Sequence, residues 1–279
     1  MENILDPRVQ RWNPIPSPFF GCAMSNPDHP TRRFTDRVAD YVRYRPGYPD
    51  DLTEYMRKNL GWGPGCVLAD LGSGTGLFTE KLLELGAVVH AIEPNAAMRA
   101  AAEEALLGRP GFLSEPGSAE ATGLDPGSLD GLSVAQAFHW FEPGPAKREF
   151  LRVLKPEAKV LLVWNERDGG TAAGAAYDGV LRRHANDYSK VDHKNINDAV
   201  LRAFLNGGDV AYASFRNHQN LDFGGLVGRV TSSSYAPKPG TVAHGHLVED
   251  LRKLFVEHAR AGILRLDYET RTWIGRPAA

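Results

Sequence analysis

Short apolar runs alternate with amphipathic segments over the first half of the chain. The runs have the length and composition of buried strands, and most are followed by apolar residues at every third or fourth position, as in a helix. The expected strands are 66–71, 87–92, a weak one near 112, 132–138 and 159–164. The expected helices are 52–60, 75–85, 95–107 and 143–154. This alternation predicts a parallel sheet with helices on both faces.

The second half of the chain breaks the alternation. Residues 169–208 contain two helical stretches, and Tyr177, Leu181 and Phe204 lie on their apolar faces. A strand at 210–221 and two helices, at 223–233 and around 247–258, are expected next. Residues 263–273 alternate charged and apolar positions, which predicts a strand with one exposed face.

The first 30 residues differ from the rest of the chain. They contain six prolines and no helical or strand period, so we interpret 1–30 as an extended arm. Residues 31–279 are expected to form one domain, because 42% apolar and 24% charged residues are ordinary values for a single large globular unit.

Charge and composition narrow the classes of function. The net charge is −2, so there is no basic excess to attract a nucleic acid. Cys22 and Cys66 form neither a metal-binding spacing nor a disulfide framework, and no metal is expected. The longest apolar run, 160–164, is too short to span a bilayer, and the N-terminus lacks a secretory pattern. We therefore expect a cytoplasmic protein that does not bind membranes.

The strongest chemical signal is the glycine loop, residues 72–76, where a strand ends and a helix begins. The segment 70–76 reads Asp-Leu-Gly-Ser-Gly-Thr-Gly. Glycines let the backbone turn sharply and let a ligand approach it, and a helix N-terminus attracts negative groups. Glu93 ends the next strand, in the position that holds ribose hydroxyls in nucleoside-binding sheets. A dinucleotide fingerprint needs glycine at its sixth position, but Leu77 stands there.

Glycines at every second position behind an acid resemble motif I of class I S-adenosylmethionine-dependent methyltransferases. The resemblance continues at 92–98, 117–120, 135–141 and 150–156. The sequence Phe-His-Trp-Phe at 138–141 and the segment 34–46 are similar to the bacterial trans-aconitate methyltransferase-like group. The similarity is close over about 31–165 and looser beyond.

This resemblance implies a Rossmann-like, doubly wound α/β fold: a seven-stranded sheet whose last strand is antiparallel. The alternating segment 263–273 agrees with that strand. Residues 169–208 then form a helical insertion before the final hairpin, where related enzymes often cover their substrate. The resemblance also implies S-adenosyl-L-methionine as cofactor and a small molecule as methyl acceptor, through an O, N, S or C nucleophile.

The family motifs also imply which residues surround the cofactor. Glu93 would hold the ribose, Asn95 and Met98 would flank the adenine, and Arg45 would pair with the carboxylate of the methionine end or else lie at the surface. The full set is Tyr44, Arg45, Asp70, Gly72, Ser73, Gly74, Thr75, Gly76, Glu93, Pro94, Asn95, Met98, Ala119, Glu120, Gln136, Ala137 and Phe138.

His139 is the candidate general base, because it follows the fourth strand at the edge where ligands bind. A base is needed only if the acceptor carries a proton, and a pocket-shaping histidine is the alternative. Trp140, Trp164 and Tyr177 are candidate walls of the substrate pocket, and ordinary packing roles are their alternatives.

Other functions use the same motifs. A protein that binds the cofactor without transferring a methyl group, such as a sensor or a cyclase, needs the same glycine loop. Leu77 argues against a dinucleotide oxidoreductase. The charge balance argues against a nucleic-acid methyltransferase. The acceptor and the oligomeric state are left open, because fold does not determine either.

Overall fold

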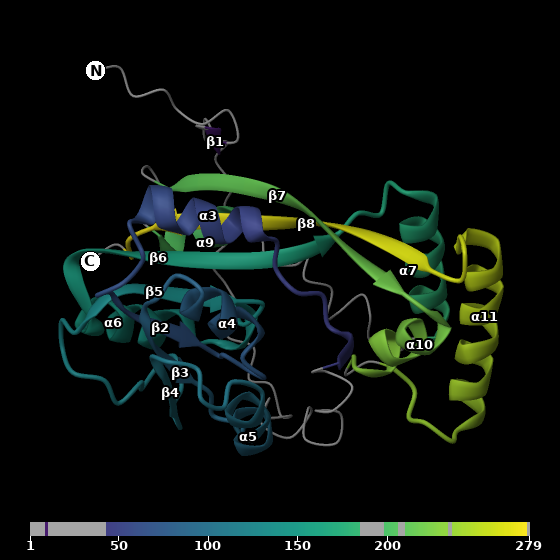
Figure 1. Ribbon diagram of the computed structural model, residues 1–279, viewed down its shortest axis with the longest axis horizontal. Coiled ribbons are helices and arrows are strands. Elements are labelled where there is room, and N and C mark those ends of the chain that lie inside the picture. The colour runs from purple at the N-terminus through teal and green to yellow at the C-terminus, as the bar shows by residue number, and fades with distance from the viewer. Residues whose placement is uncertain (1–8, 11–42, 185–197, 206–209, 234–235, 278–279) are drawn as a thin grey trace.

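The computed structural model describes residues 9–10, 43–184, 198–205, 210–233 and 236–277. Within these residues, one mixed sheet has the strand order β1-β7-β8-β6-β5-β2-β3-β4 (Figure 1). The strands are β1 (Val9–Gln10), β2 (Val67–Leu71), β3 (Val88–Ile92), β4 (Phe112–Glu115), β5 (Leu129–Ala135), β6 (Leu154–Arg167), β7 (Ala211–Leu221) and β8 (Leu264–Gly275).

The direction of the strands confirms the predicted fold class. β4, β3, β2, β5 and β6 pair in parallel, whereas β8 is antiparallel to both β6 and β7. Apart from the two-residue β1, this is the expected seven-stranded sheet with an antiparallel last strand. β1 belongs to the predicted arm and pairs with β7; the other residues of 1–30 lie outside the described residues.

Helices connect the strands close to the predicted positions. α3 begins at Asp50 behind Pro49, so neither Asp50 nor Asp51 is the N-cap. The helices are α3 (Asp50–Tyr55), its π-helical continuation η2 (Met56–Leu60), α4 (Leu77–Leu83), α5 (Ala96–Ala105), the 3₁₀ turn η3 (Phe138–Trp140), α6 (Pro143–Val153), α7 (Ala172–His184), α9 (Asp198–Phe204), α10 (Phe223–Thr231) and α11 (Val242–His258).

Two apolar cores cover the two faces of the parallel part of the sheet. β6 illustrates the division, because Val160 and Leu162 lie in the core with α6 and α9, whereas Leu161 and Val163 lie in the core with α3 and α4. Burial on both faces explains the unbroken apolar run that predicted this strand.

A third core forms a separate cap at the carboxyl end of the sheet. It contains Tyr177 and Leu181 of α7, Leu251 of α11, and residues of α10 and the distal halves of β7 and β8. Figure 1 shows these helices together, apart from the helices that cover the sheet. The cap therefore consists of α7, α10 and α11, and only α7 comes from the predicted insertion 169–208.

Tyr177, Leu181 and Phe204, which the sequence places on apolar helix faces, do not pack together: Tyr177 and Leu181 lie in the cap core and Phe204 does not. Phe204 of α9 packs in the sheet core, 4.7 Å from Phe138 and 5.5 Å from Phe150 between ring centroids. A helical period reveals that a helix has an apolar face, but not which partner covers it.

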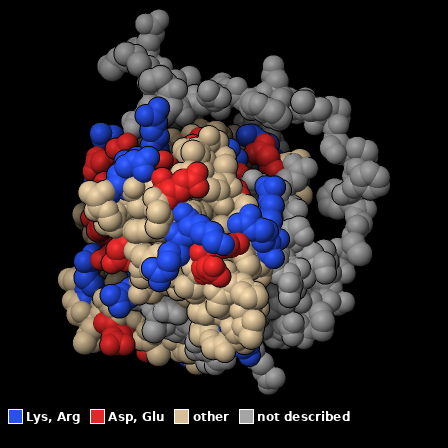
Figure 2. Space-filling model, turned by 90° about the vertical axis from the view of Figure 1, so that its right-hand side faces the viewer, with Lys and Arg blue, Asp and Glu red and all other residues tan. Residues whose placement is uncertain are grey.

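The outer face of the cap carries charges of both signs, as Figure 2 shows. Asp250 of α11 joins α11 to α7: its carboxylate lies 3.2 Å from Arg183 Nε and 3.0 Å from His184 Nε2. In the described part of the chain, no helix has the length and apolar character needed to cross a membrane. Nor do the described His, Cys, Asp and Glu residues form a group of three or more that could hold a metal ion.

Candidate active site

The glycine loop joins β2 to α4 with three glycines at positive φ. These are Gly72 at +66°, Gly74 at +58° and Gly76 at +83°, and other residues rarely adopt such values. A Cβ on Gly72 would lie 2.7 Å from the Ala137 Cβ, whereas one on Gly74 would make an ordinary contact, 3.7 Å from the Met98 methyl carbon. Gly76 is the N-cap of α4 and packs against α5. Gly72 and Gly76 are therefore needed for close packing as well as for the turn of the backbone.

Glu93 directly follows β3, and its side chain lies against the glycine loop. Oε2 accepts the Gly74 N–H at 3.0 Å and Oε1 accepts the Asn95 N–H at 2.8 Å. The residue is 8% exposed, and this burial raises the pKa of its carboxyl, although both hydrogen bonds oppose the change. Each carboxylate oxygen can accept two hydrogen bonds. The two oxygens therefore retain capacity for two ribose hydroxyls.

Asp70 lies beneath the same loop, in β2. It is 1% exposed, and its two oxygens accept the hydroxyls of Thr79 at 2.7 Å and Ser133 at 2.8 Å. Burial raises the pKa of Asp70 to about 6, and the charge of Glu93 contributes in the same direction. A cationic group above the loop would favour the ionised form of this carboxyl.

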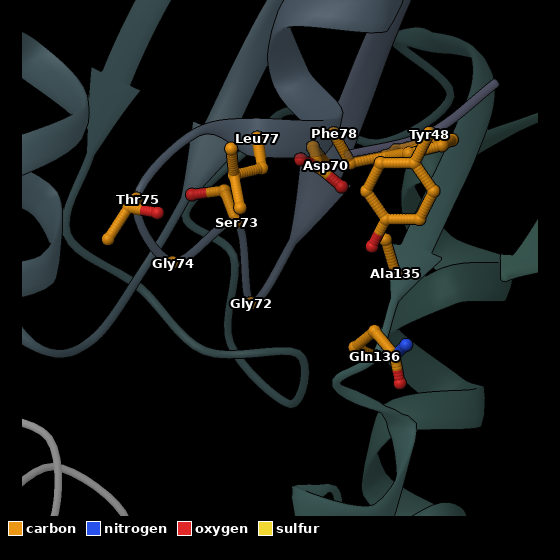
Figure 3. A pocket seen from close by; sticks show the side chains of 10 residues that line it. All are labelled: Tyr48, Asp70, Gly72, Ser73, Gly74, Thr75, Leu77, Phe78, Ala135 and Gln136. Atoms are coloured by element: carbon orange, nitrogen blue, oxygen red, sulfur yellow. The ribbon is translucent and has the colours of Figure 1, made fainter. Parts of the chain in front are cut away.

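A cleft opens beside the loop (Figure 3). The residues that line it are Tyr48, Asp70, Gly72, Ser73, Gly74, Thr75, Leu77, Phe78, Ala135 and Gln136. Six of them were predicted to contact the cofactor. The Thr75 Oγ1 and Gln136 Oε1 atoms are buried and have no hydrogen-bond partner among the described residues. The cleft thus offers unused polar atoms to a polar ligand, which fits the expected cofactor.

Tyr48 is a cleft residue that the sequence reasoning missed. Its ring packs edge-on against Phe78, with 4.8 Å between centroids, and its hydroxyl points toward Ala135 and Gln136 (Figure 3). A signal was present: the motif segment that contains Tyr44 continues through Pro46 and Gly47 to Tyr48, directly before α3.

The turn after β5 departs from the predicted strand 132–138. Gln136 has φ +57°, which ends the strand at Ala135, and its Nε2 donates to the Asn165 carbonyl at 3.2 Å. Strained backbone of this kind concentrates at functional sites. The turn continues into η3, where His139 is half-buried with its ring centroid 4.6 Å from that of Trp140. The packing of Ala137 on Gly72 brings this turn to the glycine loop.

The residues expected around the adenine lie at the ends of β3 and β4. Asn95 is the N-cap of α5, because its Oδ1 accepts the N–H groups of Ala97 at 2.9 Å and Met98 at 3.1 Å. Met98 is buried beside Gly74, and Pro94 is exposed. Their contacts with an adenine stay a prediction.

The loop after β4 contains two more residues of the set expected around the cofactor. Ser118 and Ala121 exchange backbone hydrogen bonds of 3.1 and 3.2 Å, so Ala119 and Glu120 form the tip of a tight turn. Glu120 accepts the Glu142 N–H at 2.9 Å, which ties the turn to the start of α6.

Two of the candidate pocket walls are core residues. Trp164 is 5% exposed and packs edge-on between Phe138 and Trp273, at centroid distances of 6.5 and 5.8 Å. Tyr177 is fully buried in the cap, with the Arg167 guanidinium 4.3 Å from its ring centroid. Neither lines the cleft, because the alternation of β6 and the face of α7 turn both rings into apolar cores.

Tyr44 and Arg45 lie against the cap helix α10. A Cβ on Gly228 would come within 2.1 Å of the Tyr44 ring, so the ring rests directly on that glycine. The Arg45 guanidinium donates to the Ser232 carbonyl at 3.4 Å. The structure does not bring these two side chains into the cleft, and their contacts with the cofactor stay a prediction.

Residues 69–162 match the family model described as methyltransferase domain. An uncharacterized methyltransferase of Mycobacterium tuberculosis H37Rv, Rv3342, is 40% identical over 135 residues, which is 48% of this chain and 53% of the relative. The Schizosaccharomyces pombe methyltransferase-like protein C25B8.10 is 32% identical over 170 residues, 56% of this chain and 60% of the relative. The chain thus spans about half the length of the curated relatives it matches.

Solved structures share the fold. A protein of Anaeromyxobacter dehalogenans, provisionally assigned as a type II methyltransferase, has a TM-score of 0.60 at 22% identity, over 84% of this chain and 98% of that chain. The YcgJ protein of Bacillus subtilis has a TM-score of 0.52 at 16% identity, over 82% of this chain and all of that chain. Residues 69–162 are therefore similar to a methyltransferase domain, and the chain shares the fold of these two solved structures.

Proposed function

We propose that the protein is an S-adenosylmethionine-dependent methyltransferase that acts on a small molecule. The observation that carries the proposal is the Glu93 carboxylate, which two backbone N–H groups hold in place beside Gly74, a residue that lines the cleft. Because this carboxylate is already held in one position, fixing it on ribose binding costs little conformational entropy.

When bound, the cofactor would supply an electrophilic methyl group, whose carbon an acceptor nucleophile would attack in line while S-adenosylhomocysteine leaves. The chain must align the reactants and exclude water. Glu93 and Gly74 hold the nucleoside end, and the buried Asp70 contributes negative charge below the glycine loop. His139, half-buried in the turn after β5, removes the proton from an acceptor that carries one.

Three features support a small acceptor. The net charge of −2 offers no general attraction for a nucleic acid, and the outer face of the cap in Figure 2 carries mixed charge. The cap buries its own apolar core and lies over the carboxyl edge of the sheet, where acceptors enter this kind of fold. The motif Phe-His-Trp-Phe at 138–141 adds the resemblance to the trans-aconitate methyltransferase-like group. Function in the cytoplasm, apart from membranes, is part of the same proposal.

The alternative is a protein that binds the cofactor without transferring its methyl group. A turnover assay separates the two. The protein is incubated with S-adenosylmethionine and a panel of small carboxylic acids, amines, thiols and phenols, and S-adenosylhomocysteine is measured. Formation that depends on one acceptor supports the transferase. Binding of the cofactor with no product on any acceptor supports the alternative.

A further inference from the structure

A band of amide and hydroxyl side chains crosses one face of three adjacent strands. On β7, Ala213 and Phe215 face the core under α3, and two positions further Asn217 and Gln219 occupy the same face. On β6, Leu161 and Val163 face the same core, and Asn165 follows them on the same face. The face is apolar where a helix covers it and changes to amides beyond that helix.

The members of this polar band bond to one another. Asn165 Oδ1 accepts the Thr270 hydroxyl of β8 and the Asn217 Nδ2 at 3.2 Å. The Tyr268 hydroxyl donates to Gln219 Oε1 at 3.4 Å. Asn165 is 8% exposed and Thr270 is fully buried, whereas Asn217 and Gln219 are half-buried, so the band runs from the interior toward the surface. Polar atoms at its buried end are costly unless they are paired.

The remaining donors of the band bind the carbonyls of the crossing segment, residues 43–48. Gly47 O accepts from Asn217 Nδ2 at 2.8 Å and from Asn165 Nδ2 at 3.0 Å. Tyr44 O accepts from Gln219 Nε2 at 2.8 Å. Backbone carbonyls need hydrogen-bond partners, and here amide side chains supply them.

The crossing segment connects the cleft to the cap. Figure 1 shows it passing from α3 toward α10, between the sheet and the cap helices. At one end Tyr48 lines the cleft, and at the other the Tyr44 ring rests on Gly228 of α10. Gln136, the cleft residue whose Oε1 has no partner in the described part of the chain, is tied to the same band by the bond from its Nε2 to the Asn165 carbonyl.

We propose that Asn165 and Asn217 are positioning residues of the cofactor site: they hold the Gly47 carbonyl and thereby set the side chain of Tyr48 in the cleft. The inference rests on the proposed function, because the ligand whose binding it affects is S-adenosylmethionine or its product. Tyr48 is the residue that contacts the ligand, and the two asparagines act through it.

A double-mutant cycle tests this dependence. S-adenosylhomocysteine is titrated by calorimetry into the wild type, Tyr48→Ala, Asn217→Ala and the double variant. Loss of one bond to a carbonyl should weaken binding roughly tenfold in Asn217→Ala. Tyr48→Ala should lose at least as much. Because Asn217 acts through Tyr48, the double variant should bind no more weakly than Tyr48→Ala alone.

Two further variants separate positioning from general stability. Asn217→Asp keeps the shape but removes the N–H donor, so it should weaken binding as much as Asn217→Ala. Asn220→Ala changes an exposed asparagine three residues along the same strand and should bind like the wild type. If Asn217→Ala is too unstable to titrate, Gln219→Ala releases the Tyr44 carbonyl and takes its place in the cycle, with the same expected result.

The outcomes are distinct. A wild-type protein that does not bind S-adenosylhomocysteine overturns the proposed function, and the inference with it. A wild type that binds, with losses that add in the double variant, overturns the inference alone. An Asn217→Ala variant with unchanged affinity does the same.

Discussion

The two sides of the carboxyl edge of the sheet are built in different ways. On the cofactor side, bonds to backbone groups within one strand–loop–helix–strand unit form the site: Glu93 bonds to Asn95, 2 positions away, and to Gly74, 19 positions away. On the cap side, α7, α10 and α11 come from separate parts of the second half of the chain and share a core of their own. Side chains such as Asn165 and Asn217 then join the cap side to the crossing segment.

The difference indicates how the two halves of the proposed reaction can vary. A site made by backbone at a strand–loop–helix junction depends on a few glycines and one carboxylate, so it suits a cofactor shared by many enzymes. A cap with its own core can change its residues without disturbing the sheet. Substitutions on the cofactor side should therefore change the affinity for the cofactor, whereas substitutions on the cap side should change the turnover of the acceptor.

The largest effect is expected at the junction of the two sides. His139→Ala should reduce turnover by roughly 10²–10⁴-fold while the affinity for the cofactor is unchanged, because a general base acts only in the transfer step. Turnover of the wild type should rise with pH, since only neutral imidazole accepts a proton. The measurement is initial rate against pH. A His139→Gln enzyme with a near-native rate and a flat profile would show that the residue only shapes the pocket.

A substitution that creates a cavity in the cap core tests whether the cap is energetically independent of the cofactor site. Leu251 is fully buried in the cap, and Leu251→Ala should lower the free energy of unfolding by about 2–5 kcal/mol. Acceptor turnover should fall while S-adenosylhomocysteine affinity changes little. The matched variant Leu132→Ala, in the sheet core, should impair both. Equal losses of cofactor affinity in the two variants would contradict the separation.

Asp70 gives the cofactor side a pH dependence of stability. Its pKa is raised to about 6 by burial, so between about pH 4 and 6 the folded state binds more protons than the unfolded state, and the free energy of unfolding falls as pH rises. Asp70→Asn removes this contribution. The free energy of unfolding of the variant, relative to wild type, should rise by about 2–3 kcal/mol from pH 4 to pH 7 in urea titrations. A difference that stays constant with pH would refute the assignment.

The sequence predicted the elements on the cofactor side because their signals are local. Two strands, the glycine loop and the carboxylate follow one another within 66–93: apolar runs located the strands, the glycine pattern located the loop, and the end of the second strand located Glu93. The end of β5 was misplaced, because the apolar run 132–138 continues through the point where Gln136 turns the backbone to positive φ. No apolar pattern reveals such a turn.

The cap side was predicted less well because its partners are distant in the chain. Trp164 and Tyr177 were predicted to line a substrate pocket. The register of β6 and the packing of α7 instead direct both side chains into apolar cores. The crossing segment depends on bonds such as Asn217 to Gly47, which span 170 positions. Such long-range hydrogen bonds depend on the folded topology, so local patterns in the sequence do not predict them.

The most direct test of the central claim is a calorimetric titration of S-adenosylmethionine into the wild type and Glu93→Ala, with NAD as the competing ligand. The wild type should bind S-adenosylmethionine and not NAD. Glu93→Ala should bind it more weakly by about 1.5–3 kcal/mol, because charge-assisted hydrogen bonds are lost. Glu104→Ala, which removes an exposed carboxylate from α5, should bind like the wild type. Binding of NAD by the wild type, or unchanged affinity in Glu93→Ala, would contradict the account.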